Sequence, residues 1–124
     1  QVIVHLAPPQ TEGDIDLRTR RLVAILPEKA RLVYVSTTGV YGDGGGDSFD
    51  ETRPVKPASA RAKRRVSAEN CLRNWARRRA GHLVILRVPG IYAGDRLPLE
   101  RLKKASPALL AEDDVFSNHI HADD

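Results

Sequence analysis

The sequence predicts an α/β protein that forms part of a doubly wound (Rossmann-type) parallel sheet with helices on both faces. Three short runs of Val, Ile and Leu alternate with two segments of helical spacing. Strands buried on both faces read as continuous apolar runs, and strand–helix–strand order is typical of parallel sheets with right-handed crossovers. No internal repeat divides the chain, so we expect one layered unit.

The first half of the chain predicts two strands, one helix and a long loop. The first strand covers Val2–Leu6, and a helix over Asp16–Leu26 has apolar residues at roughly helical spacing until Pro27 stops it. The second strand covers Arg31–Ser36. The segment Gly42–Pro57 is rich in Gly, Asp and Pro, which predicts a long loop.

The second half begins with the longest predicted helix, Ser59–Arg79, which Ala80-Gly81 closes as a C-cap signal. The run Leu83–Val88 predicts a third buried strand, broken by Pro89-Gly90. Two weaker elements follow, a short helix over Leu99–Lys104 and an extended piece over Asn118–His121.

The composition limits the classes of partner that the protein can bind. The chain has 20 Lys and Arg against 16 Asp and Glu, and much of the positive charge falls in the second helix. Such a run is usually a solvated face, and few aromatic side chains interleave with it, so nucleic acid is an unlikely partner. The single cysteine, Cys71, reads as a small buried residue. No apolar run approaches the length of a membrane span, so we expect no membrane partner and a cytoplasmic location.

The run Leu32–Gly42 is the most informative motif, because a strand ends there in Ser36, Thr37 and Thr38. In a parallel sheet the ligand crevice lies outside the carboxyl ends of the strands. We therefore expect these hydroxyl groups to face a ligand.

Five motifs in this order resemble those of the NAD-dependent epimerase/dehydratase family, the extended short-chain dehydrogenase/reductases. They are His5-Leu6-Ala7, the run Ser36–Gly42, Asp50-Glu51 with Pro54 and Pro57, the run Arg87–Gly94, and the run Asn118–Asp124. The resemblance implies that residues 1–124 are the central and C-terminal part of a dinucleotide-binding Rossmann domain. The N-terminal glycine-rich part and the C-terminal substrate lobe would then lie outside this sequence, which has no Gly-x-Gly-x-x-Gly motif.

The resemblance also implies a cofactor, NAD or NADP, and a small-molecule substrate such as a nucleotide sugar. A homodimer is possible. The implied cofactor-binding residues are Leu6, Ala7, Ser36, Arg65, Pro89, Gly90 and Ile91; the implied substrate-binding residues are Thr38, Arg96 and His121. Thr37 occupies the position of the catalytic hydroxyl residue. No metal site is expected, because His119 and His121 have no third ligand at a diagnostic spacing.

The catalytic helix departs from the family pattern, because Arg61 and Arg65 stand where the family has the Tyr and the Lys of Tyr-x-x-x-Lys. A guanidinium stays protonated and cannot relay the proton that a Tyr–Lys pair transfers. Spaced i,i+4, both arginines share one helix face. Arg65 could grip the cofactor ribose and Arg61 an anionic substrate group, or both could be solvated members of the basic run.

Two functions remain open. In the first, the protein is an NAD(P)-dependent epimerase, dehydratase or oxidoreductase with an atypical active site built from Thr37, Arg61 and Tyr92. In the second, it binds the cofactor without turning it over, as a redox sensor or scaffold.

Overall fold

The computed structural model describes residues 1–108 and 110–124. Its strands and α-helices are β1 (Val2–His5), α1 (Leu17–Ile25), β2 (Arg31–Thr37), α2 (Ala60–Arg79), β3 (His82–Val88), β4 (Gly90–Tyr92), α3 (Leu99–Lys103) and β5 (His119–His121). Short 3-10 helices occupy Thr38–Tyr41, Gly94–Arg96 and Ala111–Asp113. The strands and α-helices predicted from sequence are all present, with ends that move by one residue. The 3-10 helices and β4 were not predicted.

The main sheet has three parallel strands in the order β1-β2-β3. The pairing aligns His5 with Tyr34 and Thr37 with Val88, so the carboxyl ends of all three strands lie at one edge of the sheet. The predicted parallel α/β class is confirmed. The residues before and after these ends are therefore brought together whatever their distance in sequence.

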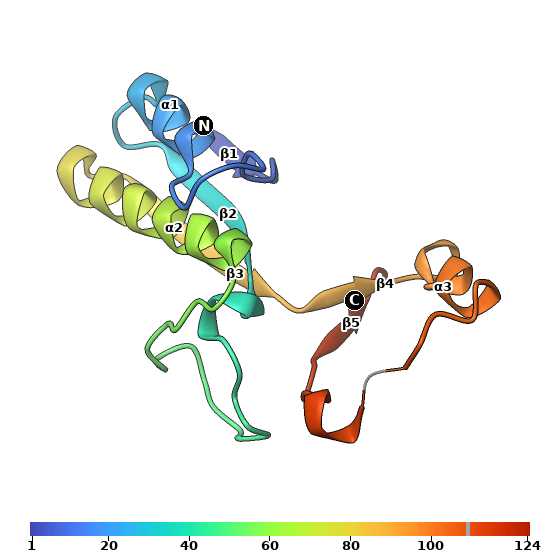
Figure 1. Ribbon diagram of the computed structural model, residues 1–124. Helices are drawn as coiled ribbons and strands as arrows, with labels where there is room; N and C mark the ends of the chain where they lie inside the picture. Colours follow the sequence, from blue (N-terminus) through green and yellow to red (C-terminus); the bar gives the residue numbers. More distant parts are fainter. Residues whose placement is uncertain (109) are drawn as a thin grey trace.

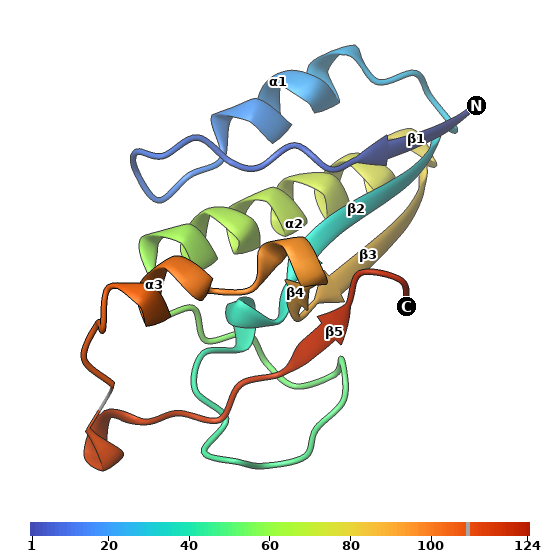
Figure 2. The same cartoon turned by 90° about the vertical axis from the view of Figure 1, so that its right-hand side faces the viewer.

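The helices α1 and α2 lie side by side on one face of this sheet, and Figures 1 and 2 show both against the same side. The core between α2 and the sheet joins Leu32 and Tyr34 of β2 to Ala68, Leu72 and Trp75 of α2. These side chains are almost fully buried. Each buried Leu of this size stabilises the fold by about 2 kcal/mol relative to exposure.

The opposite face of the sheet is open in the described part of the chain. Val2 and Val4 of β1 and Val84 and Leu86 of β3 are about half exposed or more. This differs from two expectations, that helices cover both faces and that the third strand is buried throughout. Burial alternates along β3, because only the side of the strand that carries Leu83 and Ile85 packs against the helical layer.

Local chemistry sets the helix ends. Asp16 accepts hydrogen bonds from the backbone N–H groups of Arg18 and Thr19, and Ser59 accepts one from Ala62, so both residues are N-caps rather than first helical residues. At the C-terminus of α2 the left-handed residue is Ala80, with φ of 50°. Gly81 follows because a Cβ there would lie 2.5 Å from the Trp75 ring.

A second, two-stranded parallel sheet pairs β4 with β5. The main sheet leads directly into it, since only Pro89 separates β3 from β4. Figure 1 shows this sheet and α3 set apart from the helical layer. The extended piece predicted near His119 thus becomes β5, and its backbone partner, β4, is supplied by residues just after the third strand.

Candidate functional site

A cleft of about 620 Å³ lies at the carboxyl ends of β1, β2 and β3. Its lining includes eight of the residues that the sequence singled out: Leu6, Ser36, Thr37, Arg61, Arg65, Pro89, Gly90 and Ile91. Gly39, Ser59 and Ala62 also line it, at the turn after β2 and the start of α2. The parallel topology explains why residues from distant segments share one cleft.

Thr37 is the last residue of β2 and is half-buried in this cleft. Its Oγ1 accepts a hydrogen bond of 3.2 Å from the backbone N–H of Gly39, which caps the following 3-10 helix. Because the hydroxyl oxygen accepts this hydrogen bond, the hydroxyl hydrogen of Thr37 remains free to be donated to an oxygen atom of a ligand. Thr37 is therefore both held in place and able to donate.

Ser36 lines the same cleft, but its hydroxyl is directed to the protein. It is buried, and it donates a 2.7 Å hydrogen bond to Oε1 of Glu69. The two neighbouring hydroxyl residues thus differ: the hydroxyl of Ser36 is committed to α2, whereas that of Thr37 can donate to a ligand.

Arg65 uses its guanidinium largely for structure. Its Nη1 donates to the Tyr34 hydroxyl at 3.0 Å and to the Val35 carbonyl at 2.9 Å, and the side chain is buried. Burial raises the pKa of Tyr34, and this outweighs the nearby Arg65, which acts in the opposite direction. Tyr34 is therefore no substitute for a Tyr of lowered pKa. The Nε of Arg65 is buried without a hydrogen-bond partner among the described residues.

Arg61 lies one helical turn before Arg65 and is exposed at the margin of the cleft. No ion pair or side-chain hydrogen bond joins it to any described residue. It is the cationic group of the cleft that a ligand can reach most freely. A guanidinium can bind a carboxylate or phosphate through two parallel hydrogen bonds.

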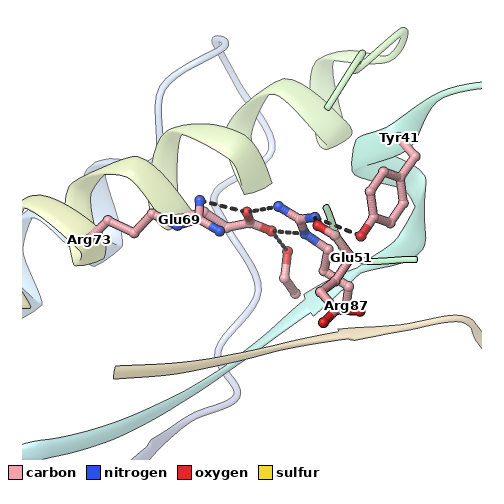
Figure 3. Close-up of polar contacts among 6 residues, drawn as sticks. Tyr41, Glu51, Glu69, Arg73 and Arg87 are labelled. Atoms are coloured by element: carbon pink, nitrogen blue, oxygen red, sulfur yellow. Dashed lines mark hydrogen bonds and ion pairs between the residues drawn. The ribbon is translucent and has the colours of Figure 1, made fainter. Parts of the chain in front are cut away.

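An ionic network centred on the buried Glu69 joins α2 to the strands next to the cleft (Figure 3). Arg87 of β3 donates from Nε and Nη2 to the two carboxylate oxygens of Glu69, at 3.1 and 2.8 Å. Arg73 adds a third cationic contact at 3.1 Å, and the Tyr41 hydroxyl accepts from Arg87 Nη1 at 2.7 Å. The network fixes the register of α2 against β2 and β3.

The negative charge of Glu69 is compensated by two guanidinium groups, those of Arg87 and Arg73. Burial would raise the pKa of the Glu69 carboxyl, but the hydrogen bonds from Arg87 and Ser36 and the charges of Arg87 and Arg73 together lower it. The pKa of Arg87 is raised further above its ordinary value, chiefly by its bonds to Glu69. Both groups are therefore charged at neutral pH.

The pairing of Glu69 with Arg87 was not predicted from the sequence, where Arg87 served only as the first residue of the motif Arg87–Gly94. The signal was present: Glu69 is the only acidic residue of α2, and Arg87 interrupts the apolar run of β3. A charged side chain that faces the core is strongly destabilising unless a side chain of opposite charge pairs with it.

Five predicted site residues do not line the cleft: Ala7, Thr38, Tyr92, Arg96 and His121. Tyr92 and His121 face each other across the second sheet, with ring centroids 5.1 Å apart, and His121 Nδ1 lies 3.5 Å from Asp123 Oδ2. Arg96 is exposed in its 3-10 helix. Thr38 lines a separate cavity, of about 820 Å³, together with Tyr41 and Arg87.

Within residues 1–108 and 110–124, no group of three or more His, Cys, Asp or Glu side chains is placed to hold a metal ion. The helices of the described part include none with the length and apolar character needed to cross a membrane. Cys71, expected to be buried, is only half-buried.

Comparison with known proteins agrees with the geometry. A model of the "NAD dependent epimerase/dehydratase family" matches residues 12–112. No curated protein gives a significant match.

Several solved structures share the fold. The dTDP-glucose 4,6-dehydratase of Bacillus anthracis str. Ames, in complex with NAD, matches 98% of this chain and 43% of its own at 22% identity, with a TM-score of 0.75. A conserved protein of unknown function from Silicibacter pomeroyi DSS matches 99% and 43% at 28% identity, with a TM-score of 0.72. RMD from Pseudomonas aeruginosa, complexed with NADPH, matches 86% and 44% at 19% identity, with a TM-score of 0.62. The chain spans less than half the length of these proteins.

Proposed function

Because the chain belongs to the NAD-dependent epimerase/dehydratase family, we propose that its cleft at the strand ends contributes to the binding of NAD or NADP. The single observation that carries this proposal is the convergence of Leu6, Thr37, Arg65 and the Pro89–Ile91 segment on one cleft. These groups come from three adjacent parallel strands and the facing helix. Dinucleotides bind at this edge of an open α/β sheet.

The residues of the cleft fit such a ligand. The hydroxyl of Thr37 can donate to an oxygen of the substrate or cofactor, and the buried Nε of Arg65 is a donor without a partner in the described chain. When bound, the cofactor supplies hydride transfer, and the chain supplies binding, orientation and electrostatics. The matched dTDP-glucose dehydratase supports a nucleotide sugar or a related carbonyl compound as the substrate class.

A second function is favoured by a specific observation at the catalytic helix. Arg61 and Arg65 replace the Tyr and Lys of the family pattern, and Arg65 is held by Tyr34 and Val35. None of the described cleft-lining side chains is a Tyr, His, Asp or Glu that could transfer a proton. This arrangement supports a protein that binds the cofactor and turns it over slowly or not at all.

Cofactor binding is tested first. Titration of the full-length protein with NADH and with NADPH, followed by nicotinamide fluorescence and calorimetry, should give saturable binding of one of them. Failure of both nucleotides to bind would overturn the proposed function.

Turnover then separates the two functions. For an enzyme, Thr37→Val should lower turnover of a nucleotide sugar by about 10²-fold, the usual effect of removing one donor to the reacting oxygen. For a binder, the unchanged protein should show no turnover. The double substitution Arg61→Tyr with Arg65→Lys should then give turnover about 10²-fold above the detection limit or more, the size of a general acid–base contribution. Arg61→Tyr alone is the control, because a Tyr without the Lys keeps its ordinary pKa.

A further inference from the structure

The polar side chains that line the cleft at the strand ends are of two kinds only in the described part of the chain, hydroxyl and guanidinium. They belong to Ser36, Thr37, Ser59, Arg61 and Arg65, and no carboxylate, amide or imidazole group lines the cleft with them. A guanidinium only donates hydrogen bonds. A ligand group that accepts hydrogen bonds and has none to donate therefore suits these side chains.

Two of the hydroxyl groups in the cleft already accept a hydrogen bond from the backbone. Thr37 Oγ1 accepts from the N–H of Gly39 at 3.2 Å, and Ser59 Oγ accepts from the N–H of Ala62 at 3.1 Å. Each hydroxyl hydrogen is then free to be donated to a ligand oxygen. These two residues add donors to those of the two arginines.

Arg65 carries a buried positive charge that no acidic side chain of the described chain neutralises. The residue is 8% exposed, and its Nη1 donates only to neutral oxygens, those of the Tyr34 hydroxyl and the Val35 carbonyl. Arg87, in contrast, pairs with the carboxylate of Glu69 at 2.8 Å. A buried charge without a counter-charge is strongly destabilising. An anion in the cleft would supply the counter-charge that Arg65 lacks.

Arg61 adds a second positive charge to the same cleft. It is exposed, and it forms no ion pair with any described residue. Arg61 and Arg65 lie four residues apart on α2, so they share one helix face and their like charges repel each other. A negatively charged group bound beside both residues would offset this repulsion. The forked guanidinium of Arg61 can bind two oxygens of such a group at once.

The N-terminus of α2 favours negative charge at the same place. The helix is 20 residues long, Ser59 is its N-cap, and its first turn has no acidic residue. The free backbone N–H groups and the dipole of a helix N-terminus attract anions. Ser59, Arg61 and Ala62 all line the cleft, so this helix end and the two arginines face one ligand.

We propose that Arg61 and Arg65 form an oxyanion subsite, which binds a carboxylate or phosphate group of the substrate. This inference rests on the cofactor-binding function proposed above and specifies the substrate class: a sugar acid or a sugar phosphate rather than a neutral sugar. Arg61 determines this specificity because its guanidinium is free to bind the ligand, whereas that of Arg65 is held against β2.

Two matched pairs of ligands test the requirement for charge. UDP-glucuronate and UDP-glucose differ only in a carboxylate in place of a hydroxymethyl group, and glucose 6-phosphate and glucose differ only in a phosphate group. Calorimetry uses the full-length protein saturated with NADH or NADPH, whichever it binds. In one pair the anionic ligand should bind more tightly by about tenfold or more, the size of a charge-assisted hydrogen-bond contribution. The pair that shows this preference identifies the bound group as a carboxylate or a phosphate.

Substitutions of Arg61 locate the subsite. Arg61→Gln should make the two members of that pair bind equally, because it removes the charge. Arg61→Lys keeps the charge and loses the forked geometry, so it should retain part of the preference. The matched control is Arg31→Gln, at the exposed start of β2, roughly 20 Å from Thr37 at 3.3 Å per residue. It should keep the full preference. Circular dichroism verifies that all three variants fold.

The inference is overturned if neither anionic ligand binds more tightly than its neutral counterpart, or if Arg31→Gln reduces the preference as much as Arg61→Gln does. It is also overturned if Arg61→Gln weakens the binding of the cofactor as strongly as that of the anionic ligand, because the diphosphate of the cofactor would then be the bound anion. Failure of the proposed function gives a different result: neither NADH nor NADPH binds to the unchanged protein, and the inference fails with it.

Discussion

At the scale of single residues, Glu69 shows how one carboxylate can organise a site. It sits on a helix that is otherwise basic, and its two oxygens accept four hydrogen bonds, from Ser36, Arg73 and Arg87. Arg87 in turn holds Tyr41, at the turn that follows Thr37. The geometry of the cleft therefore depends on an ion pair outside it.

Removing the charge of Glu69 should destabilise the protein. Glu69→Gln leaves the Arg87 guanidinium, whose side chain is 12% exposed, without its counter-charge. We expect a loss of about 3 kcal/mol in the free energy of unfolding, measured by chemical denaturation. The matched control is Glu28→Gln, which breaks the exposed pair with Arg79 and should cost less than about 1 kcal/mol.

The same variant should change the response to acid. The pKa of Glu69 is lower in the folded state than in the unfolded chain, so its contribution is present above the ordinary carboxyl value of about 4.3 and is lost as pH falls through the folded value. The unchanged protein should therefore lose more stability between pH 5 and 3 than Glu69→Gln does. If stability fell equally with pH in the two proteins, the lowered pKa of Glu69 would not be the source of the acid sensitivity.

At the scale of elements, β1 and α1 are joined by a buried chain of polar groups. His5 Nε2 lies 2.9 Å from the Thr19 hydroxyl, which donates to Asp16 Oδ2 at 2.6 Å. Asp16 is also the N-cap of α1. The start of the helix is thus tied to the end of the first strand, just before the segment that reaches the cleft.

Acidification should weaken this junction. Burial lowers the pKa of His5; the charge of Asp16 opposes this shift without cancelling it. The unfolded chain therefore takes up a proton below about pH 6.5 that the folded protein resists, so the free energy of unfolding should fall as pH drops from 7.5 to 5.5.

The variant His5→Asn removes the titrating ring and should flatten this dependence of the free energy of unfolding on pH. Thermal unfolding at each pH measures it. His82→Asn, at the exposed start of β3, is the matched control and should keep the slope of the unchanged protein. If His5→Asn retains the full slope, the pH dependence arises elsewhere.

At the scale of the whole molecule, the chain has two unlike sides. One face of the sheet carries both helices and their basic outer surface, and the other presents the apolar side chains of β1 and β3. The cleft opens at the strand ends between these sides.

This asymmetry predicts different costs for the same substitution. Leu72→Ala removes a fully buried side chain of the core and should cost about 2–5 kcal/mol. Leu86→Ala lies on the open face, where the side chain is 47% exposed, and should cost less than about 1 kcal/mol. Chemical denaturation of the two variants measures both. Equal losses would mean that the open face is covered in solution.

Much of the fold followed from sequence because its signals are local. Continuous apolar runs, apolar residues at helical spacing, and the stops at Pro27 and Ala80-Gly81 predicted the strands and helices to within a residue, although Asp16 and Ser59 proved to be N-caps. The strand that ends in Ser36 and Thr37 predicted the edge at which the cleft lies. Strand β4 was missed because its three residues pair only with β5, far along the chain.

The sequence by itself determined the parallel α/β class and the edge of the sheet at which the cleft lies, and its resemblance to the family predicted that Arg61 and Arg65 replace the Tyr–Lys pair. Only the tertiary structure decided what these groups do, because partners are set by contacts between distant segments. It directs Arg65 to Tyr34 and Ser36 to Glu69, leaves Thr37 and Arg61 available to a ligand, and places Tyr92 and His121 against each other outside the cleft. Side-chain identity limits the chemistry, and packing selects which of the possible bonds form.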